Sequence, residues 1–456
     1  MTAKPLSRQQ NLQWILPAVH GLFLLFLALT FISHSDGLVA GPFTWLGVKI
    51  PLVNADWRIG PFFLLPLLVG LGLLGSWWWG YLPEWSWGDG RITIPMLIIS
   101  LLALPSLITQ QELMGFLMLV LFWLSYVTAV NLIVFPQAWS GLTWLLIGVI
   151  LFQAGVAIYQ FVFQRSVGLY GLGEFALTTH TSDFSIVMNG DVRWLRGYGI
   201  NSHPNRLGWK LVFWLLLLWP IQTYVGRRGQ WIVGLTFLVG LGGVLVSVSR
   251  SAWLALLMGV SVYVFAWWRG RPLLEQRPSF SRQQKQFAGI VVGVMVLFVV
   301  AFSDILISRF SRPTNAIEIL PYLERMRDTP LAWQLMWLYP WLGVGPRHYS
   351  IMVRTLHPHG GIVHVVPLLI GAEVGVLGLI SCLIFWFAPL LRRDLWQNYV
   401  PQTAVWLAMM VIGLLQPEPT PFTMQGSLML GLLAAIWVKP MGKVVESDEG
   451  ERPFSE

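Results

Sequence analysis

The sequence is poor in cysteine and in charged residues. Its single cysteine, Cys382, excludes an intrachain disulfide, so exposed loops must hold their shape by packing and hydrogen bonds. Charged residues make up 11% of the 456 residues, whereas hydrophobic residues make up 55%. A water-soluble core cannot bury that much apolar surface, so lipid must solvate part of the chain. The composition therefore predicts a membrane protein.

The sequence also lacks the common signatures of nucleotide-driven and hydrolytic enzymes. It has no Walker A pattern, no H-E-x-x-H, no G-x-S-x-G and no C-x-x-C. The expected outer loops contain no Asp-x-Asp pair that could hold a divalent cation on a diphosphate. Basic groups would then have to neutralise any phosphate in a substrate, and arginine suits that task. We expect no cofactor and no bound metal.

Long apolar runs are abundant and indicate about twelve spanning helices, because a helix needs about 20 mostly apolar residues to cross a bilayer. The 26 Trp and 26 Phe fit aromatic belts at the membrane surfaces. The first run is too long for a signal-peptide core, so we expect a retained span. The expected fold is an all-α integral membrane protein. The candidate spans lie near 12–33, 61–79, 92–108, 115–135, 139–163, 207–225, 231–248, 251–268, 287–306, 366–391, 401–416 and 421–438.

The distribution of Lys and Arg in the short connections predicts the orientation. With the N-terminus in the cytoplasm, the short outer segments carry only Lys49, Arg58 and Arg250. The net charge of +8 does not indicate nucleic acid binding, since the basic residues lie between apolar segments and not on one soluble face. Both termini are therefore expected in the cytoplasm. The expected inner segments carry Lys4, Arg8, Arg91, Arg227, Arg228, Arg269, Arg271, Arg277, Arg282, Lys285, Arg392, Arg393, Lys439, Lys443 and Arg452.

Two long segments, 164–206 and 307–365, are expected as large non-cytoplasmic loops. Both are rich in arginine, against the bias of the short loops. A functional reason is one explanation, and the weaker hold of the charge rule on long loops is another. We expect one membrane domain over 1–438 and a charged cytoplasmic tail over 439–456.

Arg250 stands in a gap of a few residues between two apolar runs. A charge so close to hydrocarbon is costly and marks a candidate functional residue. The alternative is an arginine that reaches outward to the phospholipid headgroups.

The second long loop combines arginines with histidines. Such a patch suits a pyrophosphate on a lipid tail, and histidine adds a base that is partly neutral near pH 7. A zinc site at His357, His359 and His364 is an alternative, although their spacing matches no common ligand set. A structural role for most of these histidines is another. The loop carries Arg309, Arg312, Arg325, Arg327, Arg347 and Arg354 with His348, His357, His359 and His364.

The first long loop ends in a polar stretch, 193–208, that leads into an apolar run. Pro204 and Asn205 predict a helix start, with Asn205 as the N-cap and His203 at the mouth of the helix. Capping alone would explain Asn205.

These segments together resemble the O-antigen ligase and O-antigen polymerase superfamily, polytopic enzymes with a large external loop late in the chain. The resemblance covers about 196–380. One departure is Val365, because the family commonly has asparagine directly after the histidine that His364 matches. The matching motifs are Arg-Gly-x-x-x-x-x-His-Pro-Asn at 196–205, Ser-Arg-x-Ala at 249–252, Pro-Trp-Leu-Gly-Val-Gly-Pro at 340–346, and His364 followed by Pro-Leu-Leu-Ile-Gly-Ala-Glu-Val-Gly at 367–375.

The resemblance implies a membrane glycosyltransferase of polysaccharide or lipopolysaccharide biosynthesis in the bacterial inner membrane. Such an enzyme transfers a glycan, inverting and without metal, from undecaprenyl pyrophosphate to a hydroxyl of a glycan or lipid acceptor. Arg250 and either Arg325 or Arg327 would clamp the pyrophosphate, and His364 would assist the acceptor. The resemblance does not choose between ligase and polymerase. Further expected substrate-binding residues are Arg312, Arg196, His203, Asn205 and His359.

A membrane transporter of a small anion such as bicarbonate is the alternative function. A transporter should show ionisable residues along a path through the membrane, or two related halves with broken helices. The expected spans contain few such residues, among them Lys210 and Glu373, and no repeat is visible. Glycosyl transfer is therefore the favoured hypothesis.

Overall fold

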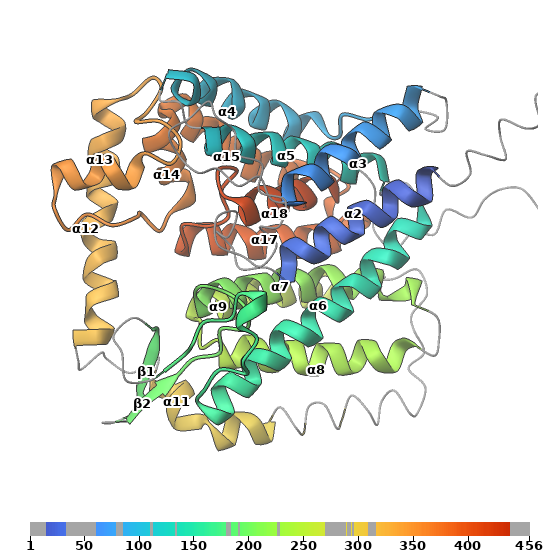
Figure 1. The fold of residues 1–456 in the computed structure, drawn as a ribbon, viewed down its shortest axis with the longest axis vertical. Coiled ribbons are helices and arrows are strands. Elements are labelled where there is room, and N and C mark those ends of the chain that lie inside the picture. The colour runs from blue at the N-terminus through green and yellow to red at the C-terminus, as the bar shows by residue number, and fades with distance from the viewer. Residues whose placement is uncertain are drawn as a thin grey trace, which may run out of the picture.

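The chain is mostly helical in the computed structural model (Figure 1). The structure describes residues 15–32, 61–78, 85–109, 113–132, 135–178, 184–189, 192–225, 229–269, 289, 293, 296–308 and 316–437. Its α-helices are α2 (Ile15–Ile32), α3 (Pro61–Trp78), α4 (Gly90–Thr109), α5 (Leu113–Leu132), α6 (Pro136–Phe163), α7 (Pro204–Ile221), α8 (Gln230–Val246), α9 (Arg250–Trp268), α11 (Ser303–Ser308), α12 (Ala316–Leu338), α13 (Tyr349–Leu356), α14 (Val366–Val374), α15 (Val376–Phe387), α16 (Leu395–Asn398), α17 (Val400–Leu415) and α18 (Met424–Ala435).

Short elements complete the fold. Strands β1 (Ile186–Asn189) and β2 (Val192–Leu195) form an antiparallel hairpin, with Ile186 opposite Leu195. The described residues also contain three 3₁₀ turns, η2 (Tyr170–Leu172), η3 (Gln222–Tyr224) and η5 (Ala388–Leu391).

Four helices in the described residues are long and apolar enough to cross a membrane, within α4, α5, α6 and α9. Shorter apolar helices lie within α2, α3, α8, α17 and α18, and another runs through α15 and η5. These helices agree with a multi-pass membrane protein, while the expected number of about twelve crossings stays a prediction. The candidate span at 287–306 falls partly outside the described residues.

The expected helix over 366–391 is broken in the structure. α14 and α15 meet at Gly375, whose φ of 90° lies in the left-handed region that favours glycine. The break opens a place where the turn after α12 docks: the Val344 amide donates to the Ala372 carbonyl at 2.9 Å, and the Val376 amide donates to the Pro340 carbonyl at 2.8 Å. The turn at 340–346 is therefore a structural clamp on a broken helix.

Helix α7 lies at the centre of the bundle. Almost all of its side chains are buried, which is the pattern of a helix apolar on every side. It packs against α6, α8, α9 and α17. Because α7 is central, its first residues lie in the middle of one end of the bundle.

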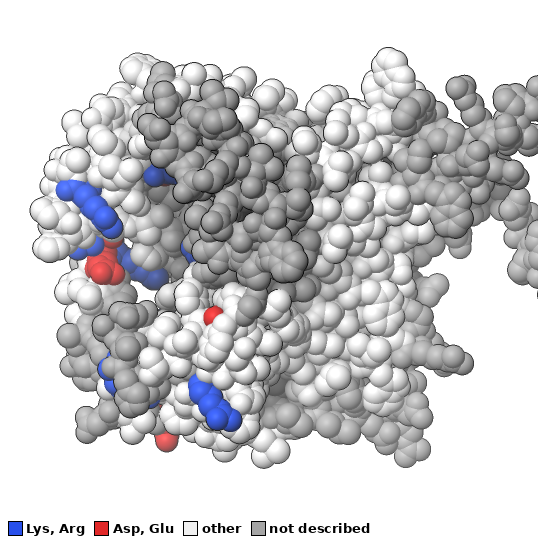
Figure 2. Space-filling view, viewed as in Figure 1, with Lys and Arg blue, Asp and Glu red and all other residues white. Residues whose placement is uncertain are grey.

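That end of the bundle also carries the two segments expected as large loops. The hairpin β1–β2 and helices α12 and α13 lie together at the left of Figure 1, away from the opposite helix ends. Figure 2 shows the charged side chains gathered at the same end, whereas the described surface over the helices is almost free of them in this view. In this view, the charged side chains therefore lie at the end of the bundle that carries the hairpin and α12.

Candidate functional site

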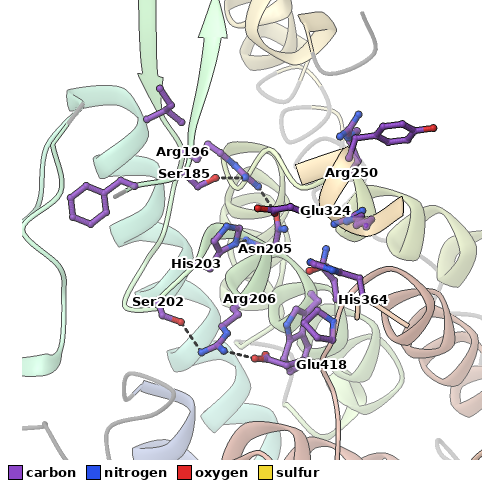
Figure 3. A pocket seen from close by; sticks show the side chains of 17 residues that line it. Ser185, Arg196, Ser202, His203, Asn205, Arg206, Arg250, Glu324, His364 and Glu418 are labelled. Carbon is purple, nitrogen blue, oxygen red and sulfur yellow. Dashed lines mark hydrogen bonds and ion pairs between the residues drawn. The ribbon is translucent and has the colours of Figure 1, made fainter. Parts of the chain in front are cut away.

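A cavity of about 520 Å³ lies at this end of the bundle (Figure 3). The starts of α7, α9 and α14, the first half of α12 and the connection after α17 all contribute to its wall. Its lining residues are Phe184, Ser185, Ile186, Arg196, Ser202, His203, Asn205, Arg206, Trp209, Arg250, Tyr322, Glu324, Arg325, His364, Gln416, Pro417 and Glu418.

The cavity brings together most of the residues singled out in the sequence. Arg327 and His359 do not line it, and Arg312 lies outside the described residues. His359 is exposed on the loop before α14, with its backbone amide donating to Nδ1 of His357 at 3.2 Å. The expected site residues found in the wall are Arg196, His203, Asn205, Arg250, Arg325 and His364.

Arg196 ties three segments of the wall together. Its side chain is buried, and Nε donates to the Ser247 carbonyl at 2.8 Å. The two terminal nitrogens donate to Ser185 Oγ at 2.7 Å and to Asn205 Oδ1 at 2.6 Å. Arg196 therefore holds together the end of α8, the segment before β1 and the start of α7.

His203, and not Asn205, caps the start of α7. The Asn205 amide donates to Nδ1 of His203 at 3.1 Å, with Pro204 at the first helical position. The expected cap at Asn205 is therefore wrong, because the helix begins one residue earlier, at Pro204; the Asn205 side-chain oxygen instead accepts from Arg196.

Burial sets the charge of His203, and its capping hydrogen bond sets which ring nitrogen carries the proton. Burial, followed by the positive charges of Arg196 and Arg206, lowers the pKa of His203 to about 3, so the ring is neutral at pH 7. Since Nδ1 accepts a hydrogen bond, the proton lies on Nε2. His203 can donate a hydrogen bond to a ligand but is poorly placed to serve as a base.

Two arginines from different helices form the basic end of the cavity. Arg250 is the first residue of α9, where the helix dipole also favours an anion. Arg325 comes from α12, and its Nε is buried without a hydrogen-bond partner among the described residues. Burial, and then the proximity of Arg250, lowers the pKa of Arg325. Like charges held this close are costly, and a bound anion would offset that cost.

Arg327 has a different role from Arg325. Its Nε donates to Oδ1 of Asp328 at 2.8 Å, and Asp328 is buried. The same carboxylate oxygen accepts the Gly361 amide at 3.2 Å, and the Tyr349 hydroxyl donates to the Asp328 carbonyl at 3.3 Å. Asp328 thus fastens α12 to α13 and to the loop that carries His364, and Arg327 pairs with its carboxylate.

His364 lies at the wall directly before α14. Burial first, and then the Arg325 charge, lowers the pKa of His364 to about 4, while the Asp328 charge opposes this shift. The imidazole is therefore neutral at pH 7 and able to accept a proton. Its Nδ1 is buried without a hydrogen-bond partner among the described residues.

The sequence did not single out several polar groups of the wall. Arg206 forms an ion pair with Glu418, with 2.5 Å between Nη2 and Oε1, and Glu324 lies beside Arg325 on α12. The sequence contained one signal for Glu418. It lies in a polar, proline-rich stretch, 416–421, that separates the last two apolar runs.

The described residues contain no group of three or more His, Cys, Asp or Glu side chains that could hold a metal ion. His357 and His359 face each other with ring centroids 5.9 Å apart, on the loop outside the cavity. His364 lies in the cavity wall. The structure gives the zinc alternative no geometric support in this part of the chain.

The fold and the site define a multi-pass helical membrane protein with a basic cavity at one end of its bundle. Residues 235–383 match the family model of the O-antigen ligase. The match runs from α8 into α15 and includes Arg250, Arg325 and His364. It confirms the resemblance over this region and supports membership of the O-antigen ligase and polymerase superfamily, whose general activity is membrane glycosyl transfer. No curated protein matches the chain.

Proposed function

We propose that the protein transfers a glycan from undecaprenyl pyrophosphate to an acceptor hydroxyl at the non-cytoplasmic face of the inner membrane. The observation that carries the proposal is the meeting of Arg250, Arg325 and His364 in one cavity, from the start of α9, the first half of α12 and the residues before α14. Its volume of about 520 Å³ is within the usual range of ligand sites.

The two arginines supply the clamp for the donor. The pyrophosphate gains negative charge when it leaves the sugar, and guanidinium groups fixed beforehand stabilise that charge more in the transition state than in the ground state. Arg325 suits this role because its Nε is desolvated and still has a hydrogen to donate. Arg250 lines the same cavity, so a diphosphate bound there would meet both guanidinium groups.

His364 supplies the base. The acceptor hydroxyl gives its proton to the neutral imidazole while its oxygen attacks the sugar carbon opposite the leaving group. The bond from that carbon to the phosphate oxygen breaks, its electron pair stays on the pyrophosphate, and the configuration inverts. A bound pyrophosphate offsets the Arg325 charge that depresses the His364 pKa. Donor binding therefore makes His364 a stronger base when it is needed.

Two features support the proposed location of the chemistry. The elements of both arginine-rich segments gather at one end of the bundle (Figure 1). The positive-inside bias assigns that end to the non-cytoplasmic side. With about twelve crossings over 1–438, both termini and the tail at 439–456 would face the cytoplasm.

The transporter alternative gains little from the buried ionisable residues. Lys210 Nζ donates to Asn201 Oδ1 at 2.5 Å, and Glu373 accepts the Arg347 backbone amide at 2.9 Å. Both side chains support local backbone turns. Neither lines the cavity.

Purified full-length protein with a lipid-pyrophosphate-linked oligosaccharide and a membrane acceptor tests the proposal. Transfer should continue in EDTA, since the clamp is built from arginine. Loss of transfer in EDTA that returns with added Mg²⁺ would reject the arginine clamp in favour of a metal-held pyrophosphate. Absence of both donor binding and transfer under all conditions would reject glycosyl transfer itself.

A further inference from the structure

Charge is distributed unevenly along the cavity. In the view of Figure 3, Arg250 and the Arg206–Glu418 ion pair lie at opposite ends, with His364 and His203 between them. The Arg250 end holds Arg250, Arg325 and Arg196 against the single carboxylate of Glu324. At the other end, the carboxylate of Glu418 balances Arg206 at 2.5 Å. The first end attracts an anion, and the second does not.

The neutral end is held rigidly from both sides. Arg206 Nη1 also donates to Ser202 Oγ at 2.7 Å, which fixes the guanidinium in front of Glu418. Glu418 lies between Pro417 and Pro419, and prolines restrict the backbone of this connection. Before it, Gln416 Nε2 donates to Ser251 Oγ at 2.9 Å.

The connection is also fastened after Glu418. Ser427 Oγ donates to the Pro421 carbonyl at 2.8 Å. The carboxylate is therefore placed before any ligand arrives, and a ligand pays little ordering entropy there.

The chemistry of this end suits sugar hydroxyls. A carboxylate accepts hydrogen bonds from hydroxyl groups, and a guanidinium donates hydrogen bonds to hydroxyl oxygens, so the pair offers both kinds of partner that a sugar hydroxyl uses. Pro417, directly before Glu418 in the chain, adds apolar wall beside the pair. A second anion would meet the Glu418 charge and find no unbalanced cation.

We propose that the Arg206–Glu418 pair forms the acceptor subsite, which binds a neutral sugar, and that Glu418 discriminates against anionic sugars. This inference rests on the proposed glycosyl transfer. If the diphosphate occupies the Arg250 end, then the acceptor must approach His364 from the other side, where the ion pair lies. The pair is thus a specificity determinant at a site separate from the donor clamp.

Two alkyl glycosides of equal chain length test the charge selection: decyl β-D-glucoside, which is neutral, and decyl β-D-glucuronide, which is anionic at pH 7. The full-length enzyme should use the glucoside in preference to the glucuronide.

The variant Glu418→Gln keeps a hydrogen-bond partner for Arg206, so we expect the protein to fold. Its KM for the glucoside should rise about tenfold, equal to about 1.4 kcal/mol, and its KM for the lipid-pyrophosphate donor should stay within about twofold. The preference over the glucuronide should fall.

The charge-swapped double variant Arg206→Glu, Glu418→Arg separates binding from structure. It retains an ion pair but exchanges the positions of the charges, so we expect it to prefer the glucuronide. A matched control is Asp89→Asn, which weakens the Arg392–Asp89 pair of 2.7 Å outside the cavity. This control should leave the ratio between the two glycosides unchanged.

Three outcomes would overturn the inference. The first is an unchanged preference in both Glu418 variants, which would make the pair purely structural. The second is a rise in the donor KM in place of the acceptor KM. The third is wild-type enzyme that binds the radiolabelled donor but transfers to neither glycoside, which would remove the subsite and leave the donor clamp standing. Failure of wild-type protein to bind the donor at all would instead refute the proposed function.

Discussion

Arginine is paired very differently in two regions of the molecule. In the connection after α15, Arg392 donates to Asp89 at 2.7 Å and to the Tyr399 hydroxyl at 2.9 Å, and its guanidinium lies 4.0 Å from the Tyr399 ring centre. In the cavity, Arg325 is half-buried near a second arginine, and its Nε has no partner among the described residues.

The contrast separates stability from function. The contacts of Arg392 offset the cost of removing its charge from water, so they fasten the start of α4 to α17. Arg325 is kept in an arrangement that only an added anion completes. An incompletely satisfied buried charge beside a like charge is a poor device for stability and a suitable one for binding phosphate.

The largest effect is expected at His364. His364→Gln can preserve one hydrogen bond but cannot take a proton at pH 7. Turnover should fall about 10²–10⁴-fold, the usual contribution of a general base, while the lipid-pyrophosphate donor still binds. Steady-state rates and donor binding, measured with the same membranes, check this. Near-normal turnover in the glutamine variant would reduce His364 to a positioning role.

The next largest effect should follow removal of Arg250. Arg250→Ala should lower transfer about 10²–10³-fold, since preorganised donors to a developing anion contribute on that scale. Arg250→Lys should rescue poorly, because a point charge does not replace a bidentate fork.

Arg392→Ala is the matched control for the comparison. It should lower the thermal midpoint of the purified protein and leave the activity per folded molecule unchanged. Normal product from Arg250→Ala would make Arg250 a headgroup anchor and erase the difference between the two regions.

A smaller effect is expected from Asp328→Asn. The Asp328 charge raises the His364 pKa against the Arg325 charge. The amide removes that support but can still accept the Gly361 amide hydrogen bond. The His364 pKa should fall, so the acid limb of kcat/KM for the acceptor should move to lower pH, with a few-fold loss of turnover. An unchanged pH profile would show that Asp328 only fastens the loop.

The sequence predicted most helix positions and six of the residues that line the cavity, but not their pairing. Arg325 and Arg327 could not be separated, because residues two apart on a helix point roughly 200° apart and the rotation of α12 is set by packing. The break at Gly375 depends on the docked turn at 340–346, which hydropathy does not report. Glu418 was missed because its partner, Arg206, is distant in the chain.

Binding of the lipid-pyrophosphate donor to Arg325→Ala and Arg327→Ala tests the central claim most directly. Both variants lose one arginine from the same helix, but only Arg325 lines the cavity. In EDTA, with full-length protein and radiolabelled donor, Arg325→Ala should weaken donor binding at least about tenfold and Arg327→Ala less than about threefold. Equal binding by both variants and the wild type would contradict the account.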